Sequence, residues 1–243
     1  MKNAIGLVFI AGLAVGGFLV SGSAGAADAT EVMRPFNGKN LEGWKNRRGD
    51  GQNLWRVGTA TLDARDRKRL AFASGGQELI NLAPGHGAGL DLYSEGVHHG
   101  DAVITLEVMV PEGSNSGIYV MGEYEVQVLD SYGNDANPGP GDMGAIYGAQ
   151  PPRNPKYRAP GEWNNYEIHW QAPRFDAQGK KTANAKFLKV MLNGAVIHEN
   201  VEMPGPTPAG VDGREKARGP LMFQGDHGPV AYRNIEIRPL ATR

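Results

Sequence analysis

The sequence predicts an all-β protein, built as a sandwich of two antiparallel sheets. The chain carries 35 Gly and 16 Pro, which is typical of a fold with many turns and few long helices. Several short segments alternate apolar and polar residues, the period of a half-buried strand. Asn193-Gly194 lies between two β-rich runs, and this pair supplies the two positive φ values of a type I′ hairpin. Strands joined by turns without intervening helices indicate packed antiparallel sheets.

The predicted strands follow one another along the chain from residue 103 onward. They share β-branched or aromatic content and, in most cases, alternation. In chain order they are Val103–Val110, Gly117–Met121, Tyr124–Leu129, Asn165–Trp170, Phe187–Leu192, Ala195–His198, Leu221–Gln224 and Val230–Ile237.

Three long loops separate these strands. Ser131–Gly161 is rich in Pro and Gly and directly follows Tyr124–Leu129, so we expect it to overhang a functional site. Pro173–Ala185 is polar and predicts a solvated hairpin extension. Met203–Gly219 is expected to wrap the outside of the sandwich, and the basic run Ala64–Arg69 predicts a solvated turn.

The first 26 residues predict a cleaved signal peptide. Lys2 precedes the largely apolar run Ala4–Val20, and Ala24-Gly25-Ala26 offers the small-residue pattern of a cleavage site. A retained membrane anchor is the alternative. With cleavage we expect a periplasmic or secreted protein that no longer contacts the membrane. No internal repeat or linker divides the rest, so residues 33–240 are expected to form one domain.

The composition excludes several function classes. The chain has no Cys, which excludes disulfides, thiolate zinc sites and a cysteine nucleophile. A formal net charge of −1 with mixed signs gives no electrostatic reason to expect nucleic acid as a partner.

The segment from Glu123 to Leu129 places polar side chains on one face of a strand. Tyr124, Val126 and Val128 share the face that belongs in the core, and Glu123, Glu125 and Gln127 share the other. Like charges two residues apart repel and gain no packing, so a functional site explains them better than structure does. The alternative is an exposed face with basic partners on the next strand.

Asp130 extends this pattern if a bulge after Gln127 or Val128 rotates it onto the polar face. The resulting Glu-x-Gln-x-x-Asp looks like the Glu-x-Asp-x-x-Glu signature of laminarinase-like retaining glucanases. Here the middle acid is an amide and the last carboxylate is one methylene shorter. The spacing of about 5–5.5 Å that retaining hydrolysis requires is then harder to reach, so an ordinary glucanase is disfavoured.

Motifs spread along the chain resemble one family when they are taken together. In order they are Phe36-Asn37-Gly38-Lys39-Asn40-Leu41-Glu42-Gly43-Trp44, Trp55-Arg56-Val57, Asn115-Ser116-Gly117-Ile118-Tyr119, Glu125-Val126-Gln127-Val128-Leu129-Asp130, Gly144-Ala145-Ile146-Tyr147, Gly161-Glu162-Trp163-Asn164-Asn165-Tyr166, Leu192-Asn193-Gly194, Gly219-Pro220-Leu221-Met222-Phe223-Gln224-Gly225-Asp226-His227-Gly228 and Tyr232-Arg233-Asn234-Ile235. The series resembles the 3-keto-disaccharide hydrolase domain, also known as domain of unknown function 1080, over roughly Met33–Leu240. Gly225-Asp226-His227-Gly228 departs from a closer Gln-x-His-Gly run by an inserted residue or a change of register, so the family pattern does not fix the direction of the His227 side chain.

The resemblance implies a concanavalin-like jelly-roll sandwich acting on sugars that carry a ketone at carbon 3. Such a ketone acidifies the proton on carbon 2. A base can remove that proton, the leaving group departs from carbon 1, and water adds back. The site therefore needs a base, a donor for the enolate oxygen and an acid for the departing oxygen.

We expect Glu125, Asp130 and His227 to be catalytic. Glu125 is the candidate base, and His227 is a histidine in a loop beside a motif-bearing strand. Arg233 shares a predicted strand face with Ile235, so its cation should find a partner among the carboxylates of the polar strand or stabilise oxyanion charge.

Further substrate contacts are assigned to polar and aromatic residues of the same motifs, with turn, core and surface roles as alternatives. They are Asn115, Glu123, Gln127, Tyr147 and Gln224. The pair His98-His99 is expected at the surface, since neighbours on a strand point apart. We predict no cofactor, because no run has the oxygen-ligand spacing of a calcium site; a divalent metal is left open.

The sequence thus predicts an exported carbohydrate-active enzyme, a hydrolase or a lyase/hydratase, that cleaves glycosidic bonds of 3-keto-sugars. Its partner is a small-molecule sugar. The alternative is a non-catalytic sugar-binding module on the same sandwich, because a fold alone does not decide function.

Overall fold

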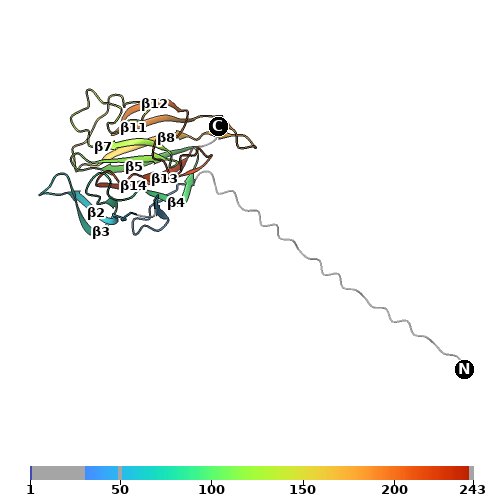
Figure 1. Ribbon diagram of the computed structural model, residues 1–243, viewed down its shortest axis with the longest axis horizontal. Helices are drawn as coiled ribbons and strands as arrows, with labels where there is room; N and C mark the ends of the chain where they lie inside the picture. Colours follow the sequence, from blue (N-terminus) through green and yellow to red (C-terminus); the bar gives the residue numbers. More distant parts are fainter. Residues whose placement is uncertain (2–30, 49–50, 241–243) are drawn as a thin grey trace.

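The computed structural model describes residues 1, 31–48 and 51–240, so the predicted signal peptide, residue 1 apart, lies outside the described residues. Within this part of the chain there are fourteen strands and no helix. Figure 1 shows the strands gathered into one layered body, with β2 and β3 at one side and β11 and β12 at the other. The predicted all-β jelly-roll sandwich is confirmed.

The smaller sheet has five strands in the order β1-β4-β13-β6-β7. All of its neighbouring pairs are antiparallel. Its strands are β1 (Trp44–Asn46), β4 (Leu92–His99), β13 (Gly219–Phe223), β6 (Asn115–Val120) and β7 (Tyr124–Leu129).

The larger sheet has seven strands in the order β12-β11-β8-β5-β14-β3-β2 and is also antiparallel throughout. Its strands are β12 (Ala195–Met203), β11 (Ala185–Leu192), β8 (Asn164–Gln171), β5 (Ala102–Met109), β14 (Val230–Pro239), β3 (Leu70–Asn81) and β2 (Trp55–Leu62). A separate hairpin of β9 (Arg174–Phe175) and β10 (Lys181–Ala183) confirms the predicted extension at Pro173–Ala185.

Every predicted strand falls on an observed one. Asn193 and Gly194 have φ values of 51° and 78°, which confirms the type I′ turn between β11 and β12. The strands that sequence patterns did not predict are β1 to β4. In β3 the central segment contains Gly75-Gly76 and is mostly exposed, so it lacks the alternation that marks a half-buried strand.

Aromatic side chains from both sheets fill the space between them. Trp44 and Phe223 of the smaller sheet stack at 5.6 Å, and Phe223 stacks on Tyr232 of the larger sheet at 3.9 Å. Elsewhere in the core, Trp170 contacts Tyr124 across the sandwich at 4.6 Å. Such pairs add about 0.5–1.5 kcal/mol each beyond the area that they bury. The aromatic contacts therefore fix how the smaller sheet, which carries the polar strand, lies on the larger one.

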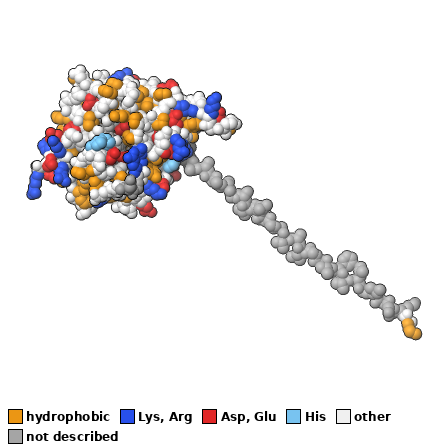
Figure 2. Space-filling view, viewed as in Figure 1, with side chains coloured by type: hydrophobic (Ala, Val, Ile, Leu, Met, Phe, Trp, Pro, Cys, Tyr) orange, Lys and Arg blue, Asp and Glu red, His pale blue; other side chains and the backbone are white. Residues whose placement is uncertain are grey.

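The surface carries acidic and basic side chains of both signs side by side, as Figure 2 shows for one face. Among the described residues no helix is long and apolar enough to cross a membrane.

Candidate functional site

The polar strand lies in β7, with its polar residues on the outer face of the five-stranded sheet. Tyr124, Val126 and Val128 enter the core between the sheets, as the alternation predicted. Glu123, Glu125 and Gln127 lie on the opposite face, where only 3–5% of each is exposed. The alternative interpretation, in which this face is exposed to solvent, therefore does not hold. Buried carboxylates need partners, and these come from neighbouring strands and loops.

The strand register arranges the outer face in two rows of residues. In the first row Tyr119 pairs with Glu125 and with Met222, and Met222 pairs with Tyr93. The second row is fixed by the pair Gly117–Gln127 and by the backbone bonds from Gln224 to Gly117 and from Arg47 to Asp91. In strand order it consists of Gln127, Gly117, Gln224, Asp91 and Arg47.

Glu125 has a perturbed pKa. Burial raises its pKa to about 7, and the negative charges of Asp91 and Asp226 act in the same direction. A hydrogen bond from the Tyr119 hydroxyl opposes the rise, because it favours the charged carboxylate. At neutral pH Glu125 is therefore divided between acid and base forms, which suits a group that takes and returns a proton.

Gly117 leaves the space that the Glu125 carboxylate occupies. A Cβ atom on Gly117 would lie 3.1 Å from Glu125 Cδ and closer still to Oε1. The same atom would lie 3.0 Å from Tyr119 Cε2. Carbon atoms in contact normally stay about 3.5–4.0 Å apart. The carboxylate thus lies directly over Gly117 of β6, which is possible because residue 117 has no side chain.

Glu123 holds a loop instead of facing the site. Its Oε1 accepts from the backbone N–H of Asp212 at 2.9 Å, and its Oε2 accepts from that of Gly213 at 3.0 Å. Thr207 joins the same loop to β7, donating to the Glu123 carbonyl at 3.0 Å and accepting from the Glu125 N–H at 3.0 Å. The segment 204–218, predicted only to wrap the outside, therefore covers the polar strand, and the substrate contact predicted for Glu123 is corrected.

Asp130 does not join the polar face. The pairing of β6 with β7 continues in register to Leu129, so the bulge expected after Gln127 or Val128 is absent from this pair. Asp130 Oδ2 accepts from the N–H of Gly113 at 2.9 Å, and Oδ1 accepts from that of Tyr132. Its carboxylate closes turns at the strand end, which corrects the expectation that it stands on the Glu125 face and removes the glucanase-like pair.

Arg233 lies on the other sheet. Its guanidinium pairs with Glu107 at 2.7 Å and with Glu78 at 3.6 Å, on the outer face of the seven-stranded sheet. The pairing of β14 with β5 shifts between Arg233 and Glu236, and Asn234 has a φ of 53°. This bulge reverses the alternation, so Arg233 and Ile235 point to opposite faces. The prediction that Arg233 meets the carboxylates of the polar strand was wrong.

His227 lies in the β13–β14 loop, at the end of the outer face. Its Nδ1 is 2.5 Å from Oδ1 of Asp226, and its ring contacts that of His86 at 4.2 Å between centroids. Asp226 also accepts, through its carbonyl oxygen, a 2.7 Å bond from the N–H of Gly87. If the Nδ1 proton is donated to Asp226, His227 Nε2 is left for proton transfer.

Other predicted residues line the same face. The bridge between Val126 and Ile146 lays the loop 131–163 along β7, and Tyr147 N–H donates to the Glu125 carbonyl at 3.2 Å. Ile146 enters the core, so Tyr147 points outward beside Glu125 and is 40% exposed. Asn115 shares a face with Gly117, and its Oδ1 is buried without a hydrogen-bond partner.

Asp91 and Arg47 are site residues that sequence reasoning missed. Arg47 pairs with Asp91 at 3.2 Å, and both side chains are largely buried. Burial raises the pKa of Asp91, and this rise is opposed by the hydrogen bond from the Gly225 N–H and by the charge of Arg47. Two adjacent hollows of about 530 and 360 Å³ share Arg47 in their linings, the first under the loop 206–213 and the second beside Asp91 and Asp226. No local pattern marks a lone Asp or Arg; only the pairing of β1 with β4 brings them together.

His99 corrects the expectation of a surface pair. It is fully buried, and its Nε2 accepts from the Met121 N–H at 3.3 Å. Burial lowers its pKa to about 4. Within the described part of the chain no group of three His, Asp or Glu side chains is arranged to hold a metal ion.

Residues 32–238 match the family of the 3-keto-alpha-glucoside-1,2-lyase-like domain. The chain belongs to this family. The match spans both sheets and every candidate residue named above. No curated protein matches the chain.

Solved structures agree with the family of the 3-keto-alpha-glucoside-1,2-lyase-like domain. One of them is a protein from Parabacteroides distasonis ATCC 8503 that is described as a "putative glycosyl hydrolase". Its sequence is 27% identical to this chain, and the two structures superpose with a TM-score of 0.64 over 86% of this chain and 84% of the other chain. A second protein of that organism, with the same description, is 17% identical with a TM-score of 0.57 over 86% of this chain and 94% of its own, which supports the fold. The chain is thus a glycosyl-hydrolase-like, carbohydrate-active protein.

Proposed function

We propose that this enzyme cleaves the glycosidic bond of 3-keto-glycosides by removing the proton on carbon 2. The observation that carries the proposal is Glu125, a buried carboxylate whose pKa is raised to about 7, on a polar face that also carries Gln127, Gln224 and Arg47. The family's name, which refers to a 1,2-lyase acting on 3-keto-glucosides, supports the same chemistry.

In the first step Glu125 takes the proton from carbon 2. The electron pair of that C–H bond moves into the C2–C3 bond, and the C3 ketone oxygen takes up the negative charge. Arg47 and the Gln224 side chain lie in the row beside Glu125 and can donate hydrogen bonds to that oxygen. Charge stabilisation in a buried site is stronger than it is in water.

In the second step the enolate re-forms the ketone and expels the group on carbon 1. The C1–O bond breaks, a C1–C2 double bond forms, and the departing oxygen receives a proton. His227 suits this role, because its bond to Asp226 fixes the ring and leaves Nε2 free. Water then adds across C1–C2, with the hydroxyl on carbon 1 and the proton returned to carbon 2, which yields the free 3-keto-sugar.

The test uses 3-keto-trehalose, 3-keto-glucosides and the unoxidised sugars in deuterated water. We expect cleavage of the keto sugars alone, with deuterium on carbon 2 of the product, and at least a hundredfold loss of kcat in Glu125→Gln. Equal turnover by the two proteins would exclude Glu125 as the base. Turnover without deuterium on carbon 2 would show direct hydrolysis.

The second candidate is a non-catalytic sugar-binding module. Tyr147 favours it, because an aromatic ring 40% exposed beside a polar face is the usual stacking surface for a sugar. Binding of keto sugars without any turnover would establish this function in place of the first.

We also propose that the protein is exported. The charged start, apolar run and Ala24-Gly25-Ala26 of the sequence support this. Expression in a bacterial host should yield a periplasmic or secreted protein whose mature N-terminus is Ala27. Recovery of the intact chain from the membrane would instead show a retained anchor.

A further inference from the structure

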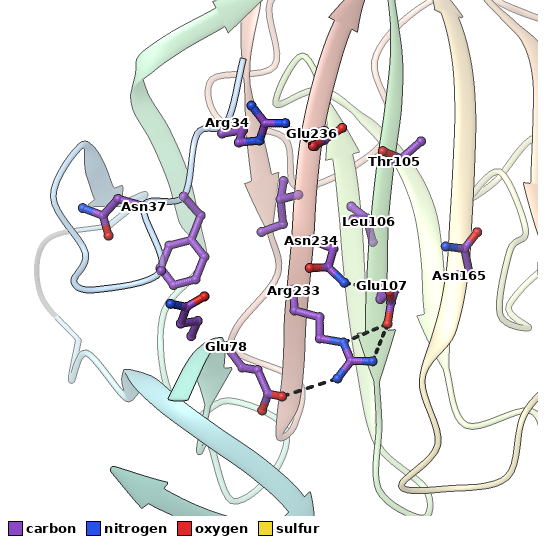
Figure 3. A pocket seen from close by; sticks show the side chains of 14 residues that line it. Arg34, Asn37, Glu78, Thr105, Leu106, Glu107, Asn165, Arg233, Asn234 and Glu236 are labelled. Atoms are coloured by element: carbon purple, nitrogen blue, oxygen red, sulfur yellow. Dashed lines mark hydrogen bonds and ion pairs between the residues drawn. The ribbon is translucent and has the colours of Figure 1, made fainter. Parts of the chain in front are cut away.

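A hollow lies on the outer face of the seven-stranded sheet, away from Glu125. Its volume is about 650 Å³, within the range of ligand sites. Figure 3 shows β14 and β5 crossing its floor, with Arg34 and Asn37 of the N-terminal segment on one side and Asn165 on the other. Because the two sheets present their outer faces on opposite sides of the sandwich, this hollow and the Glu125 site are separate.

The charges of the hollow are paired within the protein. Arg233 binds Glu107 at 2.7 Å and approaches Glu78 at 3.6 Å (Figure 3). Glu236 binds Arg34 at 2.6 Å and also Arg238. Each of the three lining carboxylates thus has a guanidinium partner, and Glu107 and Glu78 share Arg233. An ionic ligand would have to displace one of these partners, whereas a neutral polar ligand would find donors and acceptors already fixed in place.

Three polar side chains of the lining keep free hydrogen-bonding capacity. Within the described residues the side chains of Gln77, Thr105 and Asn165 have no intramolecular hydrogen bond, although all three line the hollow. The register places Asn165 beside Glu107, and Thr105 beside Glu236. Two neighbouring rows of the sheet therefore combine a paired charge with an unpaired amide or hydroxyl.

The floor of the hollow is held rigidly. Asn234, in its left-handed conformation, donates to Glu107 Oε1 at 2.8 Å, while Arg233 donates to Oε2 of the same residue at 2.8 Å. The Arg233 guanidinium stacks on Trp163 at 4.0 Å from the ring centroid. Trp163 in turn packs on a buried cluster that includes Ile80 and Met109. Groups fixed in this way lose little conformational entropy when a ligand binds.

We infer that this hollow is a second binding site, and that it takes a neutral oligosaccharide. Its paired charges disfavour ions, and its fixed carboxylates, guanidinium groups and amides match the hydroxyl groups of sugars. Phe36, which also lines it, offers an apolar surface to the C–H face of a ring. The inference does not depend on the reaction at Glu125.

The experiment measures binding of neutral gluco-oligosaccharides, namely maltohexaose, cellohexaose and laminarihexaose, by calorimetry. The full-length enzyme is compared with the double variant Thr105→Val/Asn165→Leu, which removes two polar groups without breaking an intramolecular side-chain bond. Thr105→Ser is the matched control, because it keeps the hydroxyl. Glu125→Gln separates this site from the proposed catalytic one, and oligogalacturonate serves as a charged probe.

We expect at least one neutral hexasaccharide to bind to the wild type and to Glu125→Gln with equal affinity, and the double variant to lose at least tenfold. Thr105→Ser should lose less than threefold. Turnover of a small 3-keto-glucoside should be unchanged in the double variant. No binding by any neutral hexasaccharide, tighter binding of oligogalacturonate, or binding that survives in the double variant would each overturn the inference.

Discussion

Gly117→Ala should impair the enzyme by moving one carboxylate. The new methyl group would lie 3.1 Å from Glu125 Cδ and 3.0 Å from Tyr119 Cε2. Restoring ordinary contact requires the Glu125 side chain to shift by about 0.5–1 Å, since carbon atoms in contact stay about 3.5–4.0 Å apart. A displacement of about 1 Å can cost about a hundredfold in rate. We therefore expect kcat to fall by roughly ten- to a hundredfold while KM changes little.

The pH profile separates displacement from general damage. Burial is the main cause of the raised pKa of Glu125, so a carboxylate pushed toward solvent should titrate below about 7. The acid limb of kcat/KM for a 3-keto-glucoside should therefore move to lower pH in Gly117→Ala. Gly96→Ala is the matched control, because Gly96 lies in β4 of the same sheet with nothing within 4 Å of its Cβ position.

A double-variant comparison completes the assay. If Gly117→Ala acts through Glu125, it should reduce kcat little further in Glu125→Gln, because coupled residues are not additive. Thermal unfolding reports any overpacking cost, expected at about 1–3 kcal/mol. Unchanged kcat with an unmoved acid limb would refute the proposed placement of Glu125, and so would equal losses in the two backgrounds.

Two further predictions concern the loop and the buried histidines. Glu123→Ala removes the acceptor of two backbone N–H groups, and losing bonds to a charged group costs about 1.5–3 kcal/mol of folding free energy. Urea unfolding should show that loss, and limited proteolysis should cut the variant within residues 204–218. A protease pattern like that of the wild type would count against the anchoring role. Burial lowers the pKa values of His99 and His198 to about 4, so their contribution to stability is complete above about pH 6.5 and is lost as pH falls toward 4, by up to about 3 kcal/mol each. The free energy of unfolding, measured at pH 7 and at pH 4.5, should fall less between the two pH values in His198→Gln than in the wild type. Equal losses in the two proteins would contradict the lowered pKa of His198.

Some features of the site follow from local sequence alone. Alternation along Glu123–Leu129 settles which side chains of β7 enter the core, because successive residues of a strand point to opposite faces. Asn193-Gly194 specifies its turn in the same way, since few residues tolerate two successive positive φ values. Glu125 and Gln127 were therefore located on one face from the sequence.

The tertiary structure decided which of the candidate residues meet. A single bulge at Asn234 turned Arg233 away from the core and onto the outer face of the seven-stranded sheet, and no residue pattern announces such an insertion. Glu123 became a loop anchor because residues 212 and 213, about ninety positions later, bring their N–H groups to it. Arg47 and Asp91 reached the Glu125 face only through pairing between strands distant in sequence. Local chemistry determines which face a side chain occupies, whereas long-range register determines what stands opposite it.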